Sequence, residues 1–230
     1  MNINMGFGFF QCAQLFSNLE ELSIAFDRRT NVSYHAFLEL KKLKRLLIRT
    51  ICPGELAKLL EHCNYLPQLE CLQTHSVDLN SKDLEALSKC TSLKQFILHS
   101  SGTSMNEVQL LELLKKAVAK LHQLEYLVID LGSSAVTTTY VQGLILKCPR
   151  LLAFTANMIV REENFDVRPI MEEGVMRWFM MSYIADDDDM AFKSEEYDDY
   201  TVITRYDGRF LENLLAYNND YTPPKDYFEF

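Results

Sequence analysis

The chain has 230 residues, 48% of them apolar and 24% charged, so it can bury a hydrophobic core in one or two domains. Its net charge of −9 argues against a general polyanion binder, because an acidic protein repels phosphate backbones unless a basic patch overrides the field. No apolar stretch approaches the roughly 18–20 residues of a membrane helix. The apolar N-terminus also lacks the basic residues of a signal peptide. We therefore expect neither a nucleic-acid nor a membrane partner, and a location in the cytoplasm or nucleus.

The charge is divided unevenly along the chain. Residues 1–157 carry 16 Lys and Arg against 14 Asp and Glu, whereas residues 158–230 carry 7 against 18. All of the net acidity therefore lies in the last third of the sequence. We expect two regions, a repeat region over 1–157 and an acidic C-terminal region over 158–230.

The cysteine pattern indicates a reducing compartment. No Cys-x-x-Cys pair occurs, and no Cys/His spacing typical of a zinc site is present. We predict that the six cysteines are small buried apolar side chains rather than disulfide partners. They are Cys12, Cys52, Cys63, Cys71, Cys90 and Cys148.

A repeat of 24 to 31 residues runs through the first two thirds of the chain. Each copy has the form Leu-x-x-φ-x-φ, where φ is apolar or small, as in 19–24 and 43–48. Alternating apolar positions of this kind are typical of a short strand. The leading leucines are Leu19, Leu43, Leu69, Leu93, Leu124 and Leu151.

Apolar residues also recur upstream of every leading leucine. They stand three, six, and nine or ten residues before it, which is the core-facing spacing of a helix. Each copy is therefore predicted to be a helix, a tight turn and a strand, and stacked copies bury a shared core. In chain order we expect a helix within 7–16, a helix over 55–62, a helix capped by Ser81, and a long helix over 105–120 that begins at the capping-box sequence Ser104-Met-Asn-Glu107.

The repeat pattern fades after Asn157. We predict a buried helix over 171–184, a mobile acidic loop near 185–200, a strand over 201–206 and a helix over 210–217. This order echoes the repeats. We therefore expect 158–230 to be a degenerate capping region that shields the last strand edge.

Two phrases resemble a known repeat family. They are Lys89-Cys90-Thr-Ser-Leu93 and Lys147-Cys148-Pro-Arg-Leu151, and they are similar to the cysteine–spacer–leucine phrase of F-box-type leucine-rich repeats, the branch related to ribonuclease inhibitor. The resemblance covers roughly 9–157. It implies an α/β leucine-rich-repeat solenoid of about six helix–strand units with a parallel sheet on its concave side, and we expect the acidic C-terminal region to cap it.

The resemblance also implies a function. Proteins of this branch select a target on the concave face and recruit a ubiquitin-ligase adaptor through an F-box. No F-box is visible before Leu15, and the first repeat lacks a polar cap, so we expect a chain that begins within the array or has a partner over that end. The chain is thus predicted to be a non-catalytic recognition module. It would be either the substrate-binding subunit of an SCF-type ubiquitin ligase, or a truncated relative of one, or a general leucine-rich-repeat scaffold unrelated to ubiquitin.

The variable strand positions are the candidate binding residues for a protein or peptide. They form a mixed row, in which apolar side chains stand among polar ones, as is typical of protein interfaces. The predicted set is Arg45, Leu47, Arg49, Gln73, His75, Gln95, Ile97, His99, Tyr126, Val128 and Asp130.

Catalytic and metal sites have little support in the sequence. His75 and His99 occupy equivalent places in adjacent repeats and could lie one strand spacing apart, about 5 Å, but no third ligand is obvious apart from Cys71. The run Asp186–Asp189 lacks the spacing of a calcium loop. A metal-dependent hydrolase built on these residues is therefore the minor alternative, and we expect no enzyme activity and no cofactor.

Overall fold

The computed structural model describes residues 2–4, 13–25, 34–51, 54–63, 66–103, 105–160, 178–182, 193–197 and 200–205. The chain divides into two compact units, Met1–Glu125 (unit 1) and Tyr126–Phe230 (unit 2). The predicted boundary at 157/158 stays a prediction.

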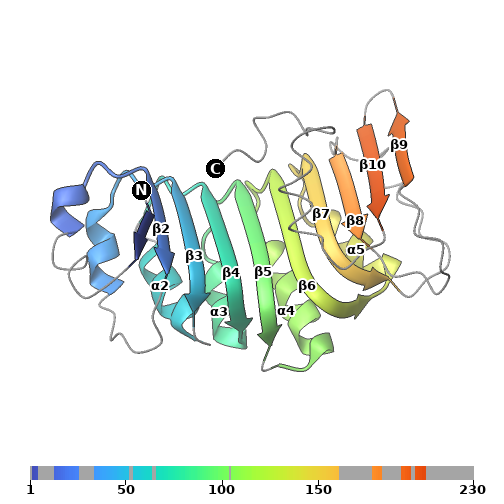
Figure 1. Ribbon diagram of the computed structural model, residues 1–230, viewed down its shortest axis with the longest axis horizontal. Helices are drawn as coiled ribbons and strands as arrows, with labels where there is room; N and C mark the ends of the chain where they lie inside the picture. Colours follow the sequence, from blue (N-terminus) through green and yellow to red (C-terminus); the bar gives the residue numbers. More distant parts are fainter. Residues whose placement is uncertain are drawn as a thin grey trace. The chain divides into compact units, whose positions relative to one another are not determined.

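Unit 1 is a parallel sheet with helices on one side (Figure 1). Its strands follow sequence order, and each pairs with the next. They are β1 (Asn2–Asn4), β2 (Glu21–Ala25), β3 (Arg45–Ile51), β4 (Cys71–Leu79) and β5 (Gln95–Thr103). The helices are the 3-10 helices η1 (Ala13–Phe16) and η2 (Tyr34–Glu39), and the α-helices α2 (Glu55–Cys63), α3 (Ser81–Leu87) and α4 (Glu107–Val118).

Unit 2 continues the same helix–strand alternation and ends in a short antiparallel pair. The strand order is β6-β7-β8-β10-β9, in which only the β10–β9 pairing among the described strands is antiparallel. Its elements are β6 (Tyr126–Val136), α5 (Thr138–Ile145), β7 (Ala153–Val160), β8 (Trp178–Ser182), β9 (Lys193–Tyr197) and β10 (Tyr200–Arg205).

The predicted α/β class and the six helix–strand units are confirmed. Within the described residues, each strand from β2 to β7 follows a helical segment in the chain. The helix over 55–62 is confirmed as α2, and the strand over 201–206 as β10. Strand β1, which pairs with β2, was not predicted.

The core consists of the apolar positions that the repeat predicts. Five of the six leading leucines are at most 2% exposed; Leu19, in the first copy, is partly exposed. In every copy the backbone N–H of the leading leucine donates to the carbonyl three residues earlier, as in Leu43 to Leu40 at 3.0 Å and Leu93 to Cys90 at 3.2 Å. This bond closes the tight turn between helix and strand. The buried upstream residues include Phe37, Leu40, Leu59, Leu66, Leu87, Cys90, Leu114, Val118, Leu121, Val141, Ile145 and Cys148.

Adjacent repeats of unit 1 are joined by shared carbonyls. The Glu20 carbonyl accepts from the backbone N–H groups of Lys44 and Arg45, at 2.8 and 3.0 Å. The Lys44 carbonyl binds Glu70 and Cys71 in the same way, both at 2.9 Å. Because these bonds use only backbone atoms, they fix the register of the strands whatever the side chains are.

A row of alternating charges runs across unit 1 at the turns that precede its strands. The residue after each leading leucine is acidic and basic in turn, in the order Glu20, Lys44, Glu70, Lys94 and Glu125. The Lys44 ammonium lies 3.0 Å from the Glu20 carboxylate, and the Lys94 ammonium 2.8 Å from that of Glu70. These side chains are half exposed, so each ion pair alone contributes little to the free energy of unfolding. The alternation of acidic and basic residues favours the register that places opposite charges side by side.

Reversing one charge in this row tests that contribution. We expect Lys94→Glu to lower the free energy of unfolding by about 1 kcal/mol at low salt, because it puts three carboxylates in a row. Adding Glu70→Lys is expected to restore part of the loss, and about 1 M salt to shrink it through screening. Urea denaturation followed by circular dichroism measures all three effects. A loss that the second substitution leaves unchanged would contradict the pairing.

A buried carboxylate joins two helices of unit 1. Asp83, in α3, is fully buried. Its Oδ1 accepts from the Ala57 N–H at 2.7 Å, and its Oδ2 from those of Gly54 and Asn80 at 3.1 and 3.0 Å. Asp83 thus caps the start of α2 from the next repeat while it completes the capping box of its own helix. Gly54 has φ +80°, and a Cβ there would lie 3.1 Å from the Asn80 Nδ2.

The caps of α3 and α4 differ from the predictions. Asn80, not Ser81, caps α3, and its Oδ1 accepts from the N–H of Asp83 at 3.1 Å. Asn106 caps α4 by accepting from the Val108 N–H at 2.9 Å, so the helix begins at Glu107 rather than at 105. In both places the asparagine amide oxygen is an acceptor as suitable as the serine hydroxyl.

The helix predicted over 171–184 is wrong at 178–182, which form β8. This strand pairs with β7 in parallel, so the edge of β7 is satisfied by hydrogen bonds. An apolar run that lies inside a parallel sheet cannot be distinguished from a buried helix by periodicity. Part of the loop expected near 185–200 is the strand β9, while 185–192, 198–199 and the helix predicted over 210–217 lie outside the described residues.

Candidate functional site

The strands of unit 1 present two different faces. Residues such as Leu46, Ile48, Leu72 and Phe96 are at most 1% exposed and point to the helices. The residues between them point the other way, to the face that carries none of the described helices (Figure 1). We call this second set the sheet face, and its members are Glu21, Ser23, Ala25, Arg45, Leu47, Arg49, Cys71, Gln73, His75, Gln95, Ile97 and His99.

The register of the strands aligns the sheet face in three rows. Glu21, Arg45, Cys71 and Gln95 pair across the strands at the start of the sheet. Ser23, Leu47, Gln73 and Ile97 pair in the middle row, and Ala25, Arg49 and His75 in the last. The predicted phase of the unit 1 strands is therefore confirmed.

Charge is neutralised in the first row. The guanidinium of Arg45 pairs with the Glu21 carboxylate across β2 and β3. Cys71, beside Arg45, is buried, and burial raises the pKa of its thiol to about 12, although the positive charge of Arg45 partly opposes the shift. This row offers neither a nucleophile nor a free charge.

The middle and last rows contain a packed polar group. The amide nitrogen of Gln73 lies 2.6 Å from the Nε2 of His75, and the two side chains are hydrogen bonded. The rings of His75 and His99 stack, with centroids 5.5 Å apart and planes at 28°. The spacing predicted for these histidines is confirmed. Among the described residues, no group of three or more His, Cys, Asp or Glu side chains is placed to hold a metal ion.

The predicted residues differ in how much surface they offer. Arg49 is exposed and Leu47 is partly exposed, whereas Ile97 keeps 8% of its surface. Gln73, His75, Gln95 and His99 are partly exposed. Leu47 is therefore the large apolar side chain of this face that a partner can contact, and Ala25 is also partly exposed.

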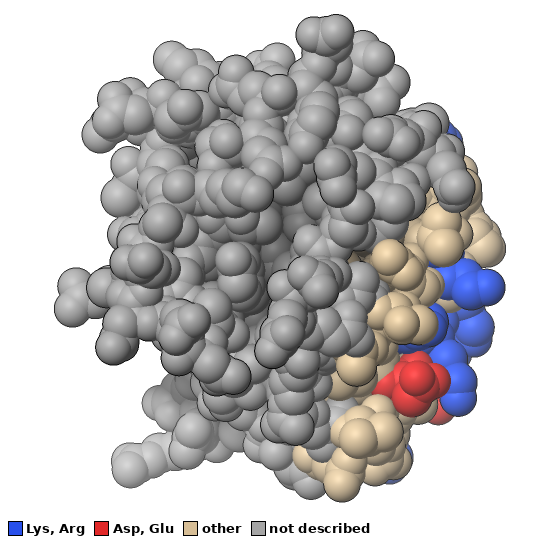
Figure 2. All heavy atoms as spheres, turned by 90° about the vertical axis from the view of Figure 1, so that its right-hand side faces the viewer, with Lys and Arg blue, Asp and Glu red and all other residues tan. Residues whose placement is uncertain are grey.

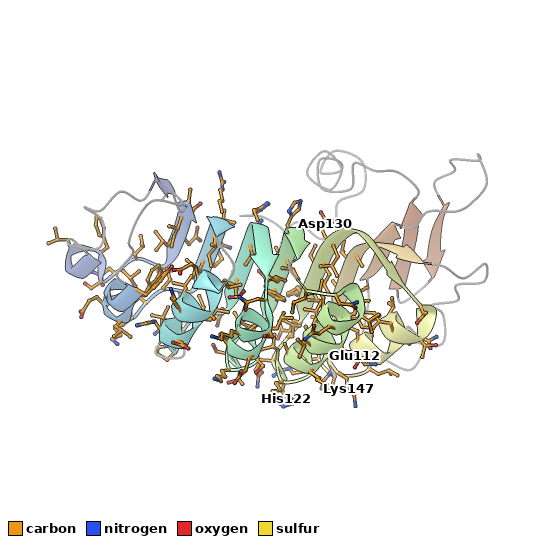
Figure 3. All side chains as sticks on the ribbon, turned by 90° about the horizontal axis from the view of Figure 1, so that it is seen from below. Glu112, His122, Asp130 and Lys147 are labelled. Carbon is orange, nitrogen blue, oxygen red and sulfur yellow. The ribbon has the colours of Figure 1, made fainter. Side chains whose placement is uncertain are left out.

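The three predicted residues of β6 lie in unit 2. Tyr126, Val128 and Asp130 alternate along β6, opposite Ala153, Thr155 and Asn157 of β7. Val128 and Asp130 are buried, at 2% and 7%, so Tyr126 is the most exposed of the three. Figure 3 shows Asp130 on the other side of this unit from Lys147, which follows α5. Their membership of one binding surface with the unit 1 residues stays a prediction.

The helical side of unit 1 has the character of a solvated surface. Its exposed side chains include both positive and negative charges, as in Lys82 and Glu85 of α3 and Lys89 just after it. The Lys89 ammonium lies 3.7 Å from the Glu85 carboxylate. Glu112 and His122 also lie on this side (Figure 3). Figure 2 shows Lys and Arg next to acidic side chains on the part of the described surface that it displays. Mixed charge of this kind needs no partner to explain it.

The carboxylate of Glu55, at the start of α2, has a structural role. It accepts from the Tyr34 hydroxyl at 2.6 Å and is bonded by the Lys58 ammonium. Burial acts to raise the pKa of Glu55, but the bonds from Lys58 and Tyr34 outweigh it and hold the pKa below its ordinary value. Its contribution to stability is therefore present at neutral pH and is lost as the pH falls through the lowered pKa.

The described cysteine side chains are buried free thiols, as predicted. They are Cys71, Cys90 and Cys148, and burial raises the pKa of each to about 12. The side chains of Cys12, Cys52 and Cys63 lie outside the description. Because a raised pKa keeps the folded thiol protonated while the unfolded thiol ionises, these sites lose stability as the pH rises from about 9 towards 12.

Alkylation provides a test of these thiols. At pH 8 only about one in ten thousand of each would be ionised in the folded chain, so we expect iodoacetamide to leave Cys71, Cys90 and Cys148 unmodified. In denaturant the same sites should react fully. Site-resolved mass spectrometry distinguishes them from the other cysteines, and rapid modification of any of the three in native conditions would show that it is accessible.

The stacked units define the class of architecture. Each copy combines a buried leucine pattern, a helical segment and a parallel strand, and this is the leucine-rich-repeat arrangement. Within the described residues, no helix has both the length and the apolar character required to cross a membrane.

The comparisons with known proteins give matches among solved structures, 14 chains in number. No family model matches the sequence, and no curated protein matches it either. Among solved structures, internalin C2 from Listeria monocytogenes is similar, with 13% sequence identity and a TM-score of 0.45. The match covers 86% of this chain and 92% of that protein. The F-box-type branch is not confirmed.

Proposed function

We propose that this chain is a non-catalytic protein-recognition module that binds its partner on the sheet face of unit 1. The observation that carries the proposal is the alignment of variable side chains in rows, one strand spacing apart, on a face free of the described helices. A parallel sheet built from backbone-registered repeats keeps such rows rigid. Rigid display lowers the entropic cost of binding a polypeptide.

The composition of the face supports a protein partner. Leu47 supplies an accessible apolar contact, Arg49 an exposed charge, and Gln73 and the two histidines supply polar groups held by one another. Arginine is enriched in protein interfaces, and the buried centre of an interface is more apolar than the rest of the surface.

Affinity capture with matched variants tests this proposal. Wild-type protein, the double variant Leu47→Asp/Arg49→Glu and the helical-side variant Lys82→Glu/Lys89→Glu would each be used as bait in a cell extract. We expect the sheet-face variant to lose specific partners that the helical-side variant retains, as identified by mass spectrometry. Circular dichroism checks that all three are folded. Partners lost only from the helical-side variant would overturn the proposal.

A narrower proposal is that the chain is the substrate-binding subunit of an SCF-type ubiquitin ligase, or a truncated relative. It is supported by the two cysteine–leucine phrases, in which Cys90 and Cys148 are buried and accept the turn bonds from Leu93 and Leu151. The same capture experiment should then recover a cullin and its adaptor. Partners without any ligase subunit would leave a general scaffold unrelated to ubiquitin.

The location proposed for the protein is the cytoplasm or nucleus. The free, buried state of Cys71, Cys90 and Cys148 supports a reducing compartment. Imaging of the tagged chain in cells would test it, and recovery from a secreted fraction would contradict it.

A metal-dependent hydrolase remains the alternative from another class. Its residues would be the two stacked histidines together with the run Asp186–Asp189, which lies outside the described residues. Elemental analysis of purified protein, with activity measured before and after chelation, distinguishes it from a recognition module. Bound metal together with chelator-sensitive hydrolysis would favour the enzyme.

A further inference from the structure

Arg49 differs in its ion pairing from the basic residues at the start of the unit 1 strands. Lys44, Arg45 and Lys94 each form an ion pair with a carboxylate of the preceding repeat. Arg49 is exposed, and it forms no ion pair or hydrogen bond with any described residue. Among the described residues of the sheet face, the cation at the start of β3 is thus neutralised, and Arg49 is the cation without such a pair near the carboxyl end of that strand.

The neighbours of Arg49 explain why it has no carboxylate partner on the sheet face. Its strand partners are Ala25 on β2 and His75 on β4. The residue two positions earlier on its own strand and on the same face is Leu47. None of these side chains carries a negative charge. Ala25 also ends at its Cβ, so this strand neighbour places no long side chain beside the guanidinium.

The spacing of Leu47 and Arg49 matches an extended polypeptide. Residues two apart on a strand lie about 6.6–6.8 Å from each other, and an extended ligand has the same spacing between side chains on one face. A ligand strand that runs along β3 can therefore place an aliphatic side chain against Leu47 and a carboxylate against Arg49. The guanidinium fork fits a carboxylate with two hydrogen bonds, which makes it selective for Asp or Glu.

We propose that the sheet face of unit 1 recognises an extended segment in which an aliphatic residue and an acidic residue stand two positions apart, with Arg49 binding the carboxylate and Leu47 the aliphatic side chain. This inference rests on the proposed function, because it names the partner chemistry of the same face. Arg49 is the specificity-determining residue, and Leu47 supplies the apolar contact.

A displayed library of random peptides tests the inference, because it offers the chain every pairing of residues two positions apart. The baits are the folded wild-type chain, Arg49→Ala, Arg49→Glu, Leu47→Asp and the helical-side control Lys82→Glu. We expect wild type and the control to enrich peptides with Asp or Glu two positions from Leu, Ile, Val or Met. Arg49→Glu should instead enrich Lys or Arg at the acidic position.

Affinities of a selected peptide then measure the contribution of each contact. A charge-assisted bidentate bond predicts that Arg49→Ala weakens binding by about 10-fold to 100-fold, and that changing the peptide's acid to its amide has a similar effect on wild type. The two changes together should cost little more than either alone, because they remove the same contact. The control should stay within about twofold of wild type.

The outcomes separate this inference from the proposed function. Peptides that bind wild type, are lost on Leu47→Asp and show no acidic preference would overturn the inference and leave the proposed function standing. No enrichment, or enrichment that neither Leu47→Asp nor the Arg49 variants alter, would count against the binding face itself.

Discussion

Asp83→Ala is expected to lower the free energy of unfolding by about 3 kcal/mol, because it leaves one buried and two partly buried backbone N–H groups without their acceptor. The carboxylate binds Gly54, Ala57 and Asn80, so the loss falls on α2 as well as on the capping box of α3. Few substitutions away from the apolar core should cost as much. Urea denaturation followed by far-ultraviolet circular dichroism measures the change.

Two further variants make this prediction specific. Asp83→Asn keeps the shape but brings an amide NH2 towards backbone donors, so it should cost a large part of the same energy. Glu85→Ala, at an exposed position of the same helix, should cost less than about 0.5 kcal/mol. If Asp83→Asn were as stable as wild type, the carboxylate would not be the acceptor that the geometry indicates.

Phe96→Ala is expected to lower the free energy of unfolding by about 4 kcal/mol, because Phe96 is 1% exposed and its removal leaves a cavity between the sheet and the helices. The equivalent position of the three preceding repeats holds Leu22, Leu46 and Leu72. Phe96→Leu restores the residue that the repeat prefers and should cost about 1 kcal/mol.

Chemical denaturation of both variants, with amide hydrogen exchange in β4 and β5, checks the Phe96 prediction. We expect exchange to accelerate in these two strands for the alanine variant and to change little for the leucine variant. Equal losses for leucine and alanine would mean that the site demands an aromatic ring rather than volume alone.

The repeated architecture was predictable because each copy repeats the same burial requirement. Leu43, Leu69, Leu93, Leu124 and Leu151 recur at the same place in the turn, and all are buried. Apolar residues stand at the same spacings before and after each of these leucines. A helix followed by a strand, stacked on the next copy, is the structure that buries all of them. The alternation within 45–49 likewise indicated the side of the sheet on which each residue lies.

The features that the prediction missed depend on contacts between repeats. Asp83 shows one sequence signal, the spacing of a capping box with Asn80, but its bond to Ala57 crosses 26 residues. The alternation of Glu20, Lys44 and Glu70 is visible once the repeats are aligned. Strand β8 was mistaken for a helix since an apolar run without period has no preferred structure until its neighbours are known.

The candidate site was predicted by position more than by accessibility. Periodicity placed Ile97 and Val128 among the outward residues, but both are buried in the folded chain. The exposed fraction of an outward side chain depends on the size of the side chains on the adjacent strands. These belong to other repeats, so the sequence of one repeat does not determine it. The unpaired state of Arg49 among the described residues likewise follows from Ala25 and His75 on the adjacent strands.

The shared carbonyls of Glu20 and Lys44 have a practical consequence for redesign. The turn that contains them is held by main-chain atoms, while the steps between leading leucines of unit 1 vary from 24 to 31 residues. The differences in length therefore lie outside these turns, and the outward residues at the start of β2 to β5 stay in register. The three outward residues of one strand could therefore be exchanged for those of another strand. The backbone bonds that hold the turns would not have to be redesigned.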